Sequence, residues 1–517
     1  MKERRARTPF ALILPVILTL ALIGPTSAGV SFNAETRLTR YWDKGGWDNY
    51  PTLAQAENGS VWLVWQSKRN PTDFDLYYNL YNGTGWMYNW TKFRERPIFT
   101  HPSQDMTPWL LQAQDGKLWL FWSSNRTGDY DIFYITSSDS GQTWTTPNPA
   151  VTNSAKDTNP VAMQARNGTM WLVWHRELSG TSSAMYKTYN GTVWSPERTI
   201  DGVNSGHPYV LQMKDGKIWV FWDLLVDVDN FEIVYRVFNG TSWSNLNRLT
   251  TRSSYDDVDP AGVQDRNGTV WVFWSARTDT SQGDIHYVSS DDNGAHWTDI
   301  DSLTTDNMDD VQPCVARISD KKLWVAWSSN RDPVLQQYDL YYTTSNQILV
   351  HDVAIQSVIH SHDPIYPGET LPVTVTTVNL GDYAESYTVN CYANSSLIGT
   401  QNVNLAGSSS AVLNFAWSTS SFAPGIYVIK AVATTVPYES IVNTVDNTLS
   451  GGSVMLKIPG DVNSDRTVSS LDLELLQDAF GSLQGVPKWN AECDINLDNV
   501  VDAFDLRLLG KNYGKTI

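Results

Sequence analysis

The chain has 517 residues and a formal net charge of −18. Because such an acidic surface repels phosphate backbones, we do not expect nucleic acid as a partner. The three cysteines, Cys314, Cys391 and Cys493, lie far apart in the sequence, whereas a disulfide framework shows a clustered, even set. Core packing or bound metal is therefore expected to stabilise the fold.

The N-terminal segment has the three parts of a secretory signal. Basic residues from Lys2 to Arg7 precede an apolar run over residues 10–24, and small residues follow up to Ala28. This order predicts a signal peptide over 1–28 and a secreted or cell-surface protein, with an uncleaved anchor as the alternative. No later run reaches the roughly 20 apolar residues that cross a bilayer, so no transmembrane segment is expected in the mature chain.

Six tryptophan-rich repeats follow the signal. Each has a proline, then in five repeats an Asn-Gly or Asp-Gly turn, then an aromatic-aliphatic strand that contains two tryptophans. Such turns favour tight hairpins, and four short strands repeated six times predict a six-bladed β-propeller over 29–346. The prolines are Pro51, Pro108, Pro160, Pro208, Pro260 and Pro313, and the second tryptophans are Trp65, Trp122, Trp174, Trp222, Trp274 and Trp327.

The sixth repeat stops without its closing strand. Near the start of the mature chain, the tripeptide at 37–39 matches Arg248-Leu249-Thr250 in the fourth repeat. We therefore predict that an N-terminal strand completes the sixth blade, which would join the ends of the ring and remove exposed strand edges.

Two of the hairpins carry the motif Ser-x-Asp-x-Gly-x-x-Trp, at residues 137–144 and 290–297. Repeated in different blades, this motif resembles the Asp box of sialidase-like propellers. The resemblance implies a structural role for the box. It also implies that catalysis would need an arginine cluster, a Tyr/Glu nucleophile pair and an Asp acid. The Phe/Tyr-Arg-Ile-Pro motif that usually brings the first arginine is present only in scrambled form at 93–98, so the catalytic residues are unknown.

Aspartates recur three residues before the repeat proline in five of the six repeats. One interpretation is that each side chain caps a turn before the inner strand; the other is a cation or polyol site at the pore mouth. Arginines recur after the tryptophan strands, which favours blade-to-blade packing or surface pairing over a catalytic cluster. The aspartates are Asp48, Asp105, Asp157, Asp257 and Asp310, and the arginines are Arg69, Arg126, Arg176, Arg277 and Arg331.

The fourth repeat breaks this pattern. Its proline is preceded by Ser205-Gly206-His207, and the acids Asp223, Asp227, Asp229 and Glu232 follow nearby. A function added to a symmetric scaffold would show as such a break, and divergence without function is the alternative.

The composition changes at about Leu349, where the tryptophan repeat ends. Short runs of alternating apolar and polar residues with Pro-Gly and Gly-Asp turns predict about seven strands of an immunoglobulin-like β-sandwich over 349–458. The segment resembles the CARDB modules of prokaryotic surface proteins, which implies a spacer or adhesion unit. Histidines at 351, 360 and 362 are either exposed linker residues or a metal site.

The C-terminal segment, 459–517, contains two acidic loops in register, each followed by apolar residues at helical spacing. Oxygen ligands on alternate loop positions can converge on one Ca²⁺ ion. The loops resemble the type I dockerin, a small helical module, and the resemblance implies two bound Ca²⁺ ions and a cohesin-like partner. The predicted ligands are Asp461, Asn463, Asp465, Thr467 and Asp472 in the first loop, and Asp494, Asn496, Asp498, Val500 and Asp505 in the second.

The loops depart from the family pattern in two respects. Arg466 and Asn499 stand at the sixth position in place of glycine, which should weaken calcium binding. The helix-start residues at 470–471 and 503–504 differ from the familiar Ser-Thr pair, which leaves the identity of the cohesin partner open.

Together these patterns favour a secreted modular protein whose propeller recognises an extracellular glycan or protein and whose dockerin tethers it. The first alternative is a sialidase-like glycoside hydrolase in a polysaccharide-degrading complex. The second is a structural surface or adhesion protein. An arginine cluster beside a Tyr–Glu pair at the pore mouth would favour the hydrolase.

Overall fold

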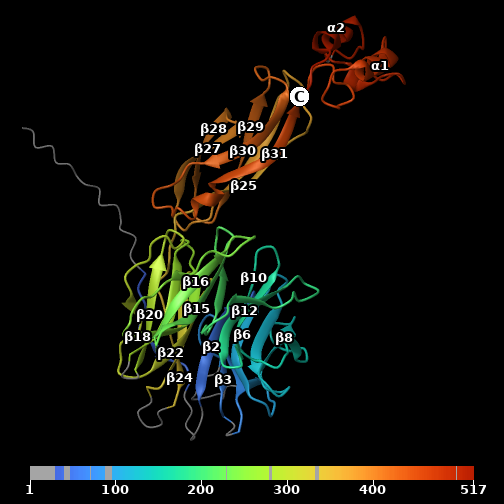
Figure 1. Ribbon diagram of the computed structural model, residues 1–517. Coiled ribbons are helices and arrows are strands. Elements are labelled where there is room, and N and C mark those ends of the chain that lie inside the picture. The colour runs from blue at the N-terminus through green and yellow to red at the C-terminus, as the bar shows by residue number, and fades with distance from the viewer. Residues whose placement is uncertain are drawn as a thin grey trace, which may run out of the picture.

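The computed structural model describes residues 30–39, 47–69, 72–87, 96–228, 230–278, 282–331, 337–496 and 498–517. Three modules follow one another along the chain: a ring of sheets, a β-sandwich and a pair of helices (Figure 1). The mainly β fold predicted from the sequence, with helices near the C-terminus, is confirmed. The predicted signal peptide lies outside the described residues.

The first three blades each contain four antiparallel strands that neighbour one another in sequence order. In each blade a β-bulge at the repeat proline interrupts the pairing of the innermost strand. The strands are β2 (Asp48–Gln55), β3 (Val61–Ser67), β4 (Asp75–Tyr81), β5 (Arg96–Phe99), β6 (Asp105–Gln112), β7 (Leu118–Ser124), β8 (Asp131–Ser137), β9 (Asn148–Val151), β10 (Lys156–Gln164), β11 (Met170–Leu178), β12 (Thr181–Tyr189) and β13 (Arg198–Asp201).

The last three blades repeat this order, and the sixth is completed from the N-terminus. There, β1 pairs with β24 with Thr36 opposite Tyr342 and Arg37 opposite Tyr341, which confirms the predicted closure of the ring. The strands are β14 (Tyr209–Gln212), β15 (Ile218–Asp227), β16 (Asn230–Phe238), β17 (Asn247–Arg248), β18 (Tyr255–Gln264), β19 (Val270–Thr278), β20 (Gly283–Ser290), β21 (Asp301–Ser302), β22 (Asp310–Arg317), β23 (Leu323–Ser329), β24 (Asp339–Thr344) and β1 (Thr36–Arg37).

Buried tryptophans, and glycines that pack closely against them, hold the blades together. The second tryptophan of every repeat is completely buried, and burial of such a large ring contributes strongly to stability. In the Asp-box hairpin of the second blade, a Cβ on Gly141 would lie 2.3 Å from the Trp62 ring of the first blade. Gly294 meets Trp219 in the same way, so these hairpins pack against the neighbouring blade.

The second module is a sandwich of two sheets, with strand orders β25-β26-β29 and β28-β27-β30-β31. Its core includes Trp417 and Val389, both almost fully buried. The elements are β25 (Val353–His360), β26 (Thr370–Asn379), β27 (Glu385–Ala393), β28 (Ser396–Leu405), β29 (Ser410–Ser418), β30 (Gly425–Ala433), the 3₁₀ helix η1 (Thr444–Asn447) and β31 (Thr448–Leu456).

The third module contains α1 (Ser470–Ala479), the 3₁₀ helix η2 (Ala491–Cys493) and α2 (Ala503–Asn512). Both α-helices begin with a capping box, at Ser469 and Asp502, which satisfies backbone N–H groups at the helix start. Within the described residues, no helix has both the length and the apolar character needed to cross a membrane.

The sandwich lies against one end of the propeller. Asp382 accepts hydrogen bonds from Arg266 and Lys321, each at 2.6 Å, and a Cβ on Gly268 would lie 1.9 Å from Val442. These propeller residues belong to hairpins that follow the innermost strands. The sandwich therefore covers the end of the ring opposite to the end where the innermost strands begin (Figure 1).

Candidate functional site

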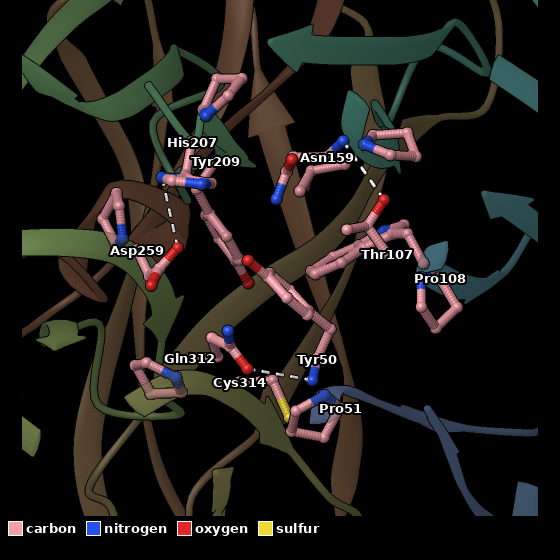
Figure 2. A pocket seen from close by; sticks show the side chains of 16 residues that line it. Tyr50, Pro51, Thr107, Pro108, Asn159, His207, Tyr209, Asp259, Gln312 and Cys314 are labelled. Atoms are coloured by element: carbon pink, nitrogen blue, oxygen red, sulfur yellow. Dashed lines mark hydrogen bonds and ion pairs between the residues drawn. The ribbon is translucent and has the colours of Figure 1, made fainter. Parts of the chain in front are cut away.

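A pocket lies on the central axis, at the end of the propeller where the innermost strands begin. Its wall is formed by the six repeat prolines and by the residue before each of them, together with Trp109, Val161, Tyr209 and Cys314. The rings of Tyr50 and Tyr209 converge near its centre (Figure 2). The six residues before the prolines are Tyr50, Thr107, Asn159, His207, Asp259 and Gln312.

Most of these lining residues have a strained backbone. Five of the six have positive φ values, between 48° and 57°, a region that residues other than glycine seldom occupy. Strain of this kind persists only where the surrounding structure enforces it, and it concentrates at functional sites. The repeated β-bulge thus holds one side chain from each of five blades at the pocket.

Hydrogen bonds between blades support this conformation. The Thr107 N–H donates to Gln66 Oε1 at 2.7 Å, and the Gln312 N–H donates to Ser275 Oγ at 2.8 Å. The Tyr50 N–H donates to Gln312 Oε1 at 3.2 Å, which links the first blade to the sixth. Because these bonds satisfy buried N–H groups across blade boundaries, the shape of the pocket depends on closure of the whole ring.

The five recurring aspartates lie elsewhere, two residues before the lining positions. Each is at most 1% exposed and none lines the pocket. Asp105, for example, accepts hydrogen bonds from Trp122 Nε1 and from Arg126, both at 2.8 Å. A cation or polyol site formed by Asp48, Asp105, Asp157, Asp257 and Asp310 themselves stays a prediction, and these internal partners do not favour it.

Four of the five recurring arginines pair with the buried aspartate of their own blade, a pairing that the sequence did not predict. The fifth blade differs, because Arg252 donates to Asp257 at 2.6 Å. Arg277 instead lines a groove that continues from the pocket and shares Tyr50, His207 and Asp259 with it.

In the fourth blade the buried carboxylate comes from a different position of the repeat. Ser205 replaces the recurring aspartate, and Trp222 Nε1 has no hydrogen-bond partner among the described residues. Asp223, directly after this tryptophan, lies beside His207 instead. A Cβ at position 206 would lie 1.6 Å from Asp223 Oδ1, so only glycine leaves room for the carboxylate there. The break of symmetry noted in the sequence thus brings His207 to the pocket and Asp223 to the adjoining groove.

His207, Asp223 and Asp259 form one charged cluster. His207 Nδ1 lies 2.8 Å from Asp223 Oδ2 and 3.3 Å from Asp259 Oδ1. Burial disfavours the imidazolium, but the Asp259 and Asp223 carboxylates outweigh it and raise the pKa of His207 to about 10. Burial also raises the pKa of Asp259. At Asp223 burial acts in the same sense, yet the adjacent His207 holds the pKa of this carboxyl below its ordinary value.

A second imidazole faces the same groove. His175 lies with its ring centre 6.1 Å from that of His207, and its Nε2 has no hydrogen-bond partner among the described residues. Burial lowers the pKa of His175 to about 4, so this side chain is a neutral acceptor at physiological pH. The other acids named in the fourth repeat contribute less: Glu232 accepts from Thr250, Asp227 is exposed, and Asp229 lies outside the described residues.

Sequence reasoning missed most of the pocket. It singled out His207 and Asp223 but not Thr107, Asn159, Asp259 or Gln312. The position before the repeat proline holds a different residue type in every repeat, but the neighbouring positions, apart from the proline and the aspartate, vary as well. The sequence therefore carries little signal for these lining residues.

The first acidic loop of the C-terminal module places its carboxylates around one point. Asp461, Asp465 and Asp472 each bring an oxygen within 4.8 Å of the others, and Asp461 Oδ1 is buried without a hydrogen-bond partner among the described residues. Arg466 has φ 74°, which provides the turn that glycine gives in the family pattern. These features fit a hard, oxygen-liganded ion such as Ca²⁺.

The second loop repeats these features. Asn499 has φ 69°, and Asp505 accepts the Asn496 N–H at 3.1 Å as Asp472 accepts the Asn463 N–H at 3.0 Å. Thr467 and Val500, the predicted carbonyl donors, each donate their N–H to the aspartate two residues earlier. Leu497 lies outside the described residues, and the predicted ligand roles in both loops stay predictions.

The histidines of the sandwich do not converge. His351 stacks on Tyr383 with ring centres 4.3 Å apart and contacts Glu385 at 2.5 Å. His360 and His362 lie at the other end of β25 (Val353–His360). Among the described residues, no group of three metal-ligating side chains includes any of them.

Comparison with known proteins identifies two of the three modules. The dockerin type I domain model matches residues 459–513, and the CARDB model matches residues 351–450. Both predictions from the sequence are confirmed. Dockerin type I domains bind calcium, and they support attachment to a cohesin partner. Modular proteins that contain them are extracellular or associated with the cell surface. No curated protein matches the chain significantly.

Solved structures similar to this chain include sialidase-like propellers. A protein of unknown function from Dyadobacter fermentans has a TM-score of 0.51 at 14% identity, covering 62% of this chain and all of that one. The NanB sialidase from Streptococcus pneumoniae has a TM-score of 0.47 at 10% identity, covering 61% and 71%. A Hadza microbial sialidase has 0.45 at 14%, covering 57% and 65%. At these identities the likeness concerns the fold alone.

Proposed function

We propose that the propeller binds an extracellular glycan in its central pocket while the dockerin holds the protein on a cohesin-type partner. The observation that carries this proposal is the ring of six different side chains at the pocket. A phenol, a hydroxyl, two amides, an imidazole and a carboxylate converge there from six blades. Such a set offers both donors and acceptors, which suits a ligand with many hydroxyl groups.

The aromatic residues of the pocket support the same class of ligand. Trp109 and Tyr209 pack edge to face, with ring centres 5.4 Å apart, and both line the pocket beside Tyr50. Binding sites commonly combine such aromatic walls with a few convergent polar groups. Aromatic walls contact the apolar faces of sugar rings, and the polar groups select their hydroxyls.

The order of the modules supports a tethering role. The pocket opens at the end of the propeller that the sandwich does not cover, so a spacer and a calcium-loaded dockerin can anchor the chain without obstructing it. We propose that the dockerin holds two Ca²⁺ ions, one in each loop. We also propose that residues 1–28 direct export, so that the protein acts outside the cell or at its surface.

The test is a glycan array followed by calorimetry with the mature chain in Ca²⁺. For a glycan that binds, we expect Tyr50→Phe and Asn159→Ala each to weaken binding at least about fivefold, since each removes one hydrogen bond. Tyr81→Phe is the matched control, because the Tyr81 hydroxyl donates to Gly83 on the outer surface. No binding of any glycan, or equal losses in the control, would contradict the proposal.

Glycoside hydrolysis is a second candidate, favoured by the Asp259 carboxyl group at the pocket and the Asp223 carboxyl group in the adjoining groove. The environment raises the pKa of Asp259 and lowers that of Asp223, and such a divergent pair provides an acid and a base. Turnover of any glycoside in a panel, abolished in Asp259→Asn, would establish this activity. Absence of both binding and turnover would favour a structural surface protein.

A further inference from the structure

We infer that His207, Asp223 and Asp259 form a binding site for one divalent transition-metal ion, with Zn²⁺ as the ion of choice for testing. The site lies at the wall of the central pocket and draws on the fourth and fifth blades. It goes beyond the proposed function, because an ion would bind there whether or not a glycan does.

The ligand atoms already have suitable separations. One atom from each residue lies within 4.8 Å of the others, and the His207 nitrogen is 2.8 Å and 3.3 Å from oxygens of Asp223 and Asp259. Zinc bonds of about 2.0–2.2 Å place tetrahedral ligands about 3.3–3.5 Å apart. An ion therefore requires only small displacements of these side chains.

The ligand types indicate the class of metal. One imidazole nitrogen with two carboxylate oxygens suits ions of intermediate softness such as Zn²⁺. Calcium prefers a shell made of oxygens alone, which the dockerin loops provide. The calcium loops and the pocket site therefore differ in chemistry, and saturating Ca²⁺ can occupy the loops while the pocket site is titrated.

Neighbouring groups fix the ligands in place. The Asp259 N–H donates to Asp223 Oδ2 at 3.1 Å, and Gly206 provides the space into which this carboxylate fits. Support of this kind around the ligands orients them and strengthens metal binding. In four other blades the recurring aspartate accepts a hydrogen bond from the second tryptophan, whereas Trp222 Nε1 has no partner among the described residues and the carboxylate of this blade lies beside His207 instead.

The surroundings of the site include groups of both signs. His175 adds an imidazole whose Nε2 has no partner among the described residues, at a ring-to-ring distance of 6.1 Å from His207, where it can approach the ion directly or through water. Arg277 lines the same groove and opposes a cation. Binding of the ion to His207 displaces the imidazolium proton to solvent, after which two carboxylates face one guanidinium.

The experiment titrates Zn²⁺ into the mature full-length protein in saturating Ca²⁺ and follows heat and Co²⁺ absorption in parallel. We expect about one Zn²⁺ equivalent, and a Co²⁺ spectrum typical of nitrogen and oxygen ligands. Asp223→Asn and His207→Gln should each weaken Zn²⁺ binding by about tenfold or more. His296→Gln is the matched control, since His296 and Asp292 form an exposed pair with a separation of 2.6 Å.

Asp223→Asn retains an oxygen that can accept the Asp259 N–H, so its fold can be verified by its melting temperature without metal. Absence of a Zn²⁺ equivalent in the unmodified protein would overturn the inference, as would equal affinity in the unmodified protein and in both site variants. A loss of the same size in His296→Gln would also overturn it. Because the readout is metal binding, failure here leaves the glycan proposal standing.

Discussion

The residues before the repeat prolines combine a strained backbone conformation with side chains of different chemical types. Tyr50, Asn159 and Gln312 all have φ near 55°, although none is glycine, and each presents a different group to the pocket. The surrounding blade tolerates the strain because the N–H groups of such residues are held by the preceding blade. The scaffold thus imposes the position and leaves the chemistry of the side chain free to vary.

Gly206 is the residue on which the relocated carboxylate depends. In Gly206→Ala the new Cβ would lie 1.6 Å from Asp223 Oδ1 and 2.7 Å from its Cγ, and Asp223 is fully buried. We expect a loss of about 1–3 kcal/mol in stability together with loss of Zn²⁺ binding. Gly202→Ala, where the Cβ meets Thr199 only at 3.8 Å, should melt within about 2 °C of the parent. Calorimetric melting of both variants checks this, and equal shifts would contradict it.

Asp105 illustrates the role of the buried aspartates. Asp105→Ala removes the partner of Trp122 Nε1 and leaves the Arg126 guanidinium without its carboxylate. Removing one partner of a buried ion pair costs about 3–5 kcal/mol, so we expect a markedly lower melting temperature. Asp129→Ala, at an exposed position of the same blade, should change it little. A mild effect of Asp105→Ala would contradict this role.

At the scale of elements, ring closure depends on one short strand. β1 contributes two residues to its ladder with β24, but the next residue, Leu38, is 6% exposed and packs in the core shared by the first and sixth blades. The Leu340 N–H also donates to Thr39 Oγ1 at 2.9 Å. Side chains beyond the ladder thus provide much of the closure.

Leu38→Ala should therefore weaken the ring. A buried leucine truncated to alanine costs about 2–5 kcal/mol, and here the cavity would lie between the first and last blades. We expect earlier thermal unfolding and faster proteolysis near the N-terminus. Leu246→Ala, which truncates a leucine that is 38% exposed, is the control, and similar melting of the two variants would contradict this role of Leu38.

The two calcium loops should be separable. Asp472 and Asp505 are each fully buried at the starts of α1 and α2. Calorimetry of the full-length protein should give two Ca²⁺ equivalents, and one in Asp472→Ala. Asp478→Ala, on the exposed face of α1, should keep both. A chelator should reduce helix content, since metal binding and folding are coupled in such small modules; unchanged stoichiometry in Asp472→Ala would contradict the ligand assignment.

Sequence periodicity predicted the blades, the sandwich and the paired loops, because these follow from local patterns that repeat. The closing strand was predictable for the same reason, since residues 37–39 match a strand of another blade. The pocket was not, because the meeting of His207 with Asp259 depends on how adjacent blades are staggered. The recurring proline likewise did not reveal the bulge that, in five blades, turns the preceding residue toward the axis. For Arg277 the periodic pattern was misleading. It recurs with the arginines that pair with an aspartate, yet in the fifth blade Arg252 forms this ion pair.

At the scale of the whole molecule, the propeller and the sandwich meet through buried charges. Asp382 is held by Arg266 and Lys321. Because of these two cations, its carboxylate stays charged although it is buried. Nearby Asp352 is 6% exposed and its Oδ1 has no hydrogen-bond partner among the described residues. The junction therefore contains one well-satisfied carboxylate and one poorly satisfied one.

The poorly satisfied carboxyl group of Asp352 predicts that the stability of the folded protein depends on pH. Burial, together with Asp446, raises the pKa of Asp352 to about 7, above its value of about 3.9 in an unfolded chain. The folded state therefore binds more protons between these values, and stability should fall as the pH rises from about 4 to about 7. Asp352→Asn should melt higher than the parent at pH 8 and close to it at pH 4.5. Asp299→Asn, at an exposed site, is the control, and an equal gain at both pH values would contradict this assignment.

The way the sandwich is clamped also determines how the molecule would carry mechanical load. A pull on the dockerin reaches the propeller through the chain that leaves the sixth blade, whose last strand is joined to β1 by only a short ladder. Arg266 on the fifth blade and Lys321 on the sixth both hold Asp382, and Lys214 on the fourth donates to Asn443 at 2.5 Å. The force is thus distributed over three blades, as shear across their hairpins, and does not peel the final strand from the ring.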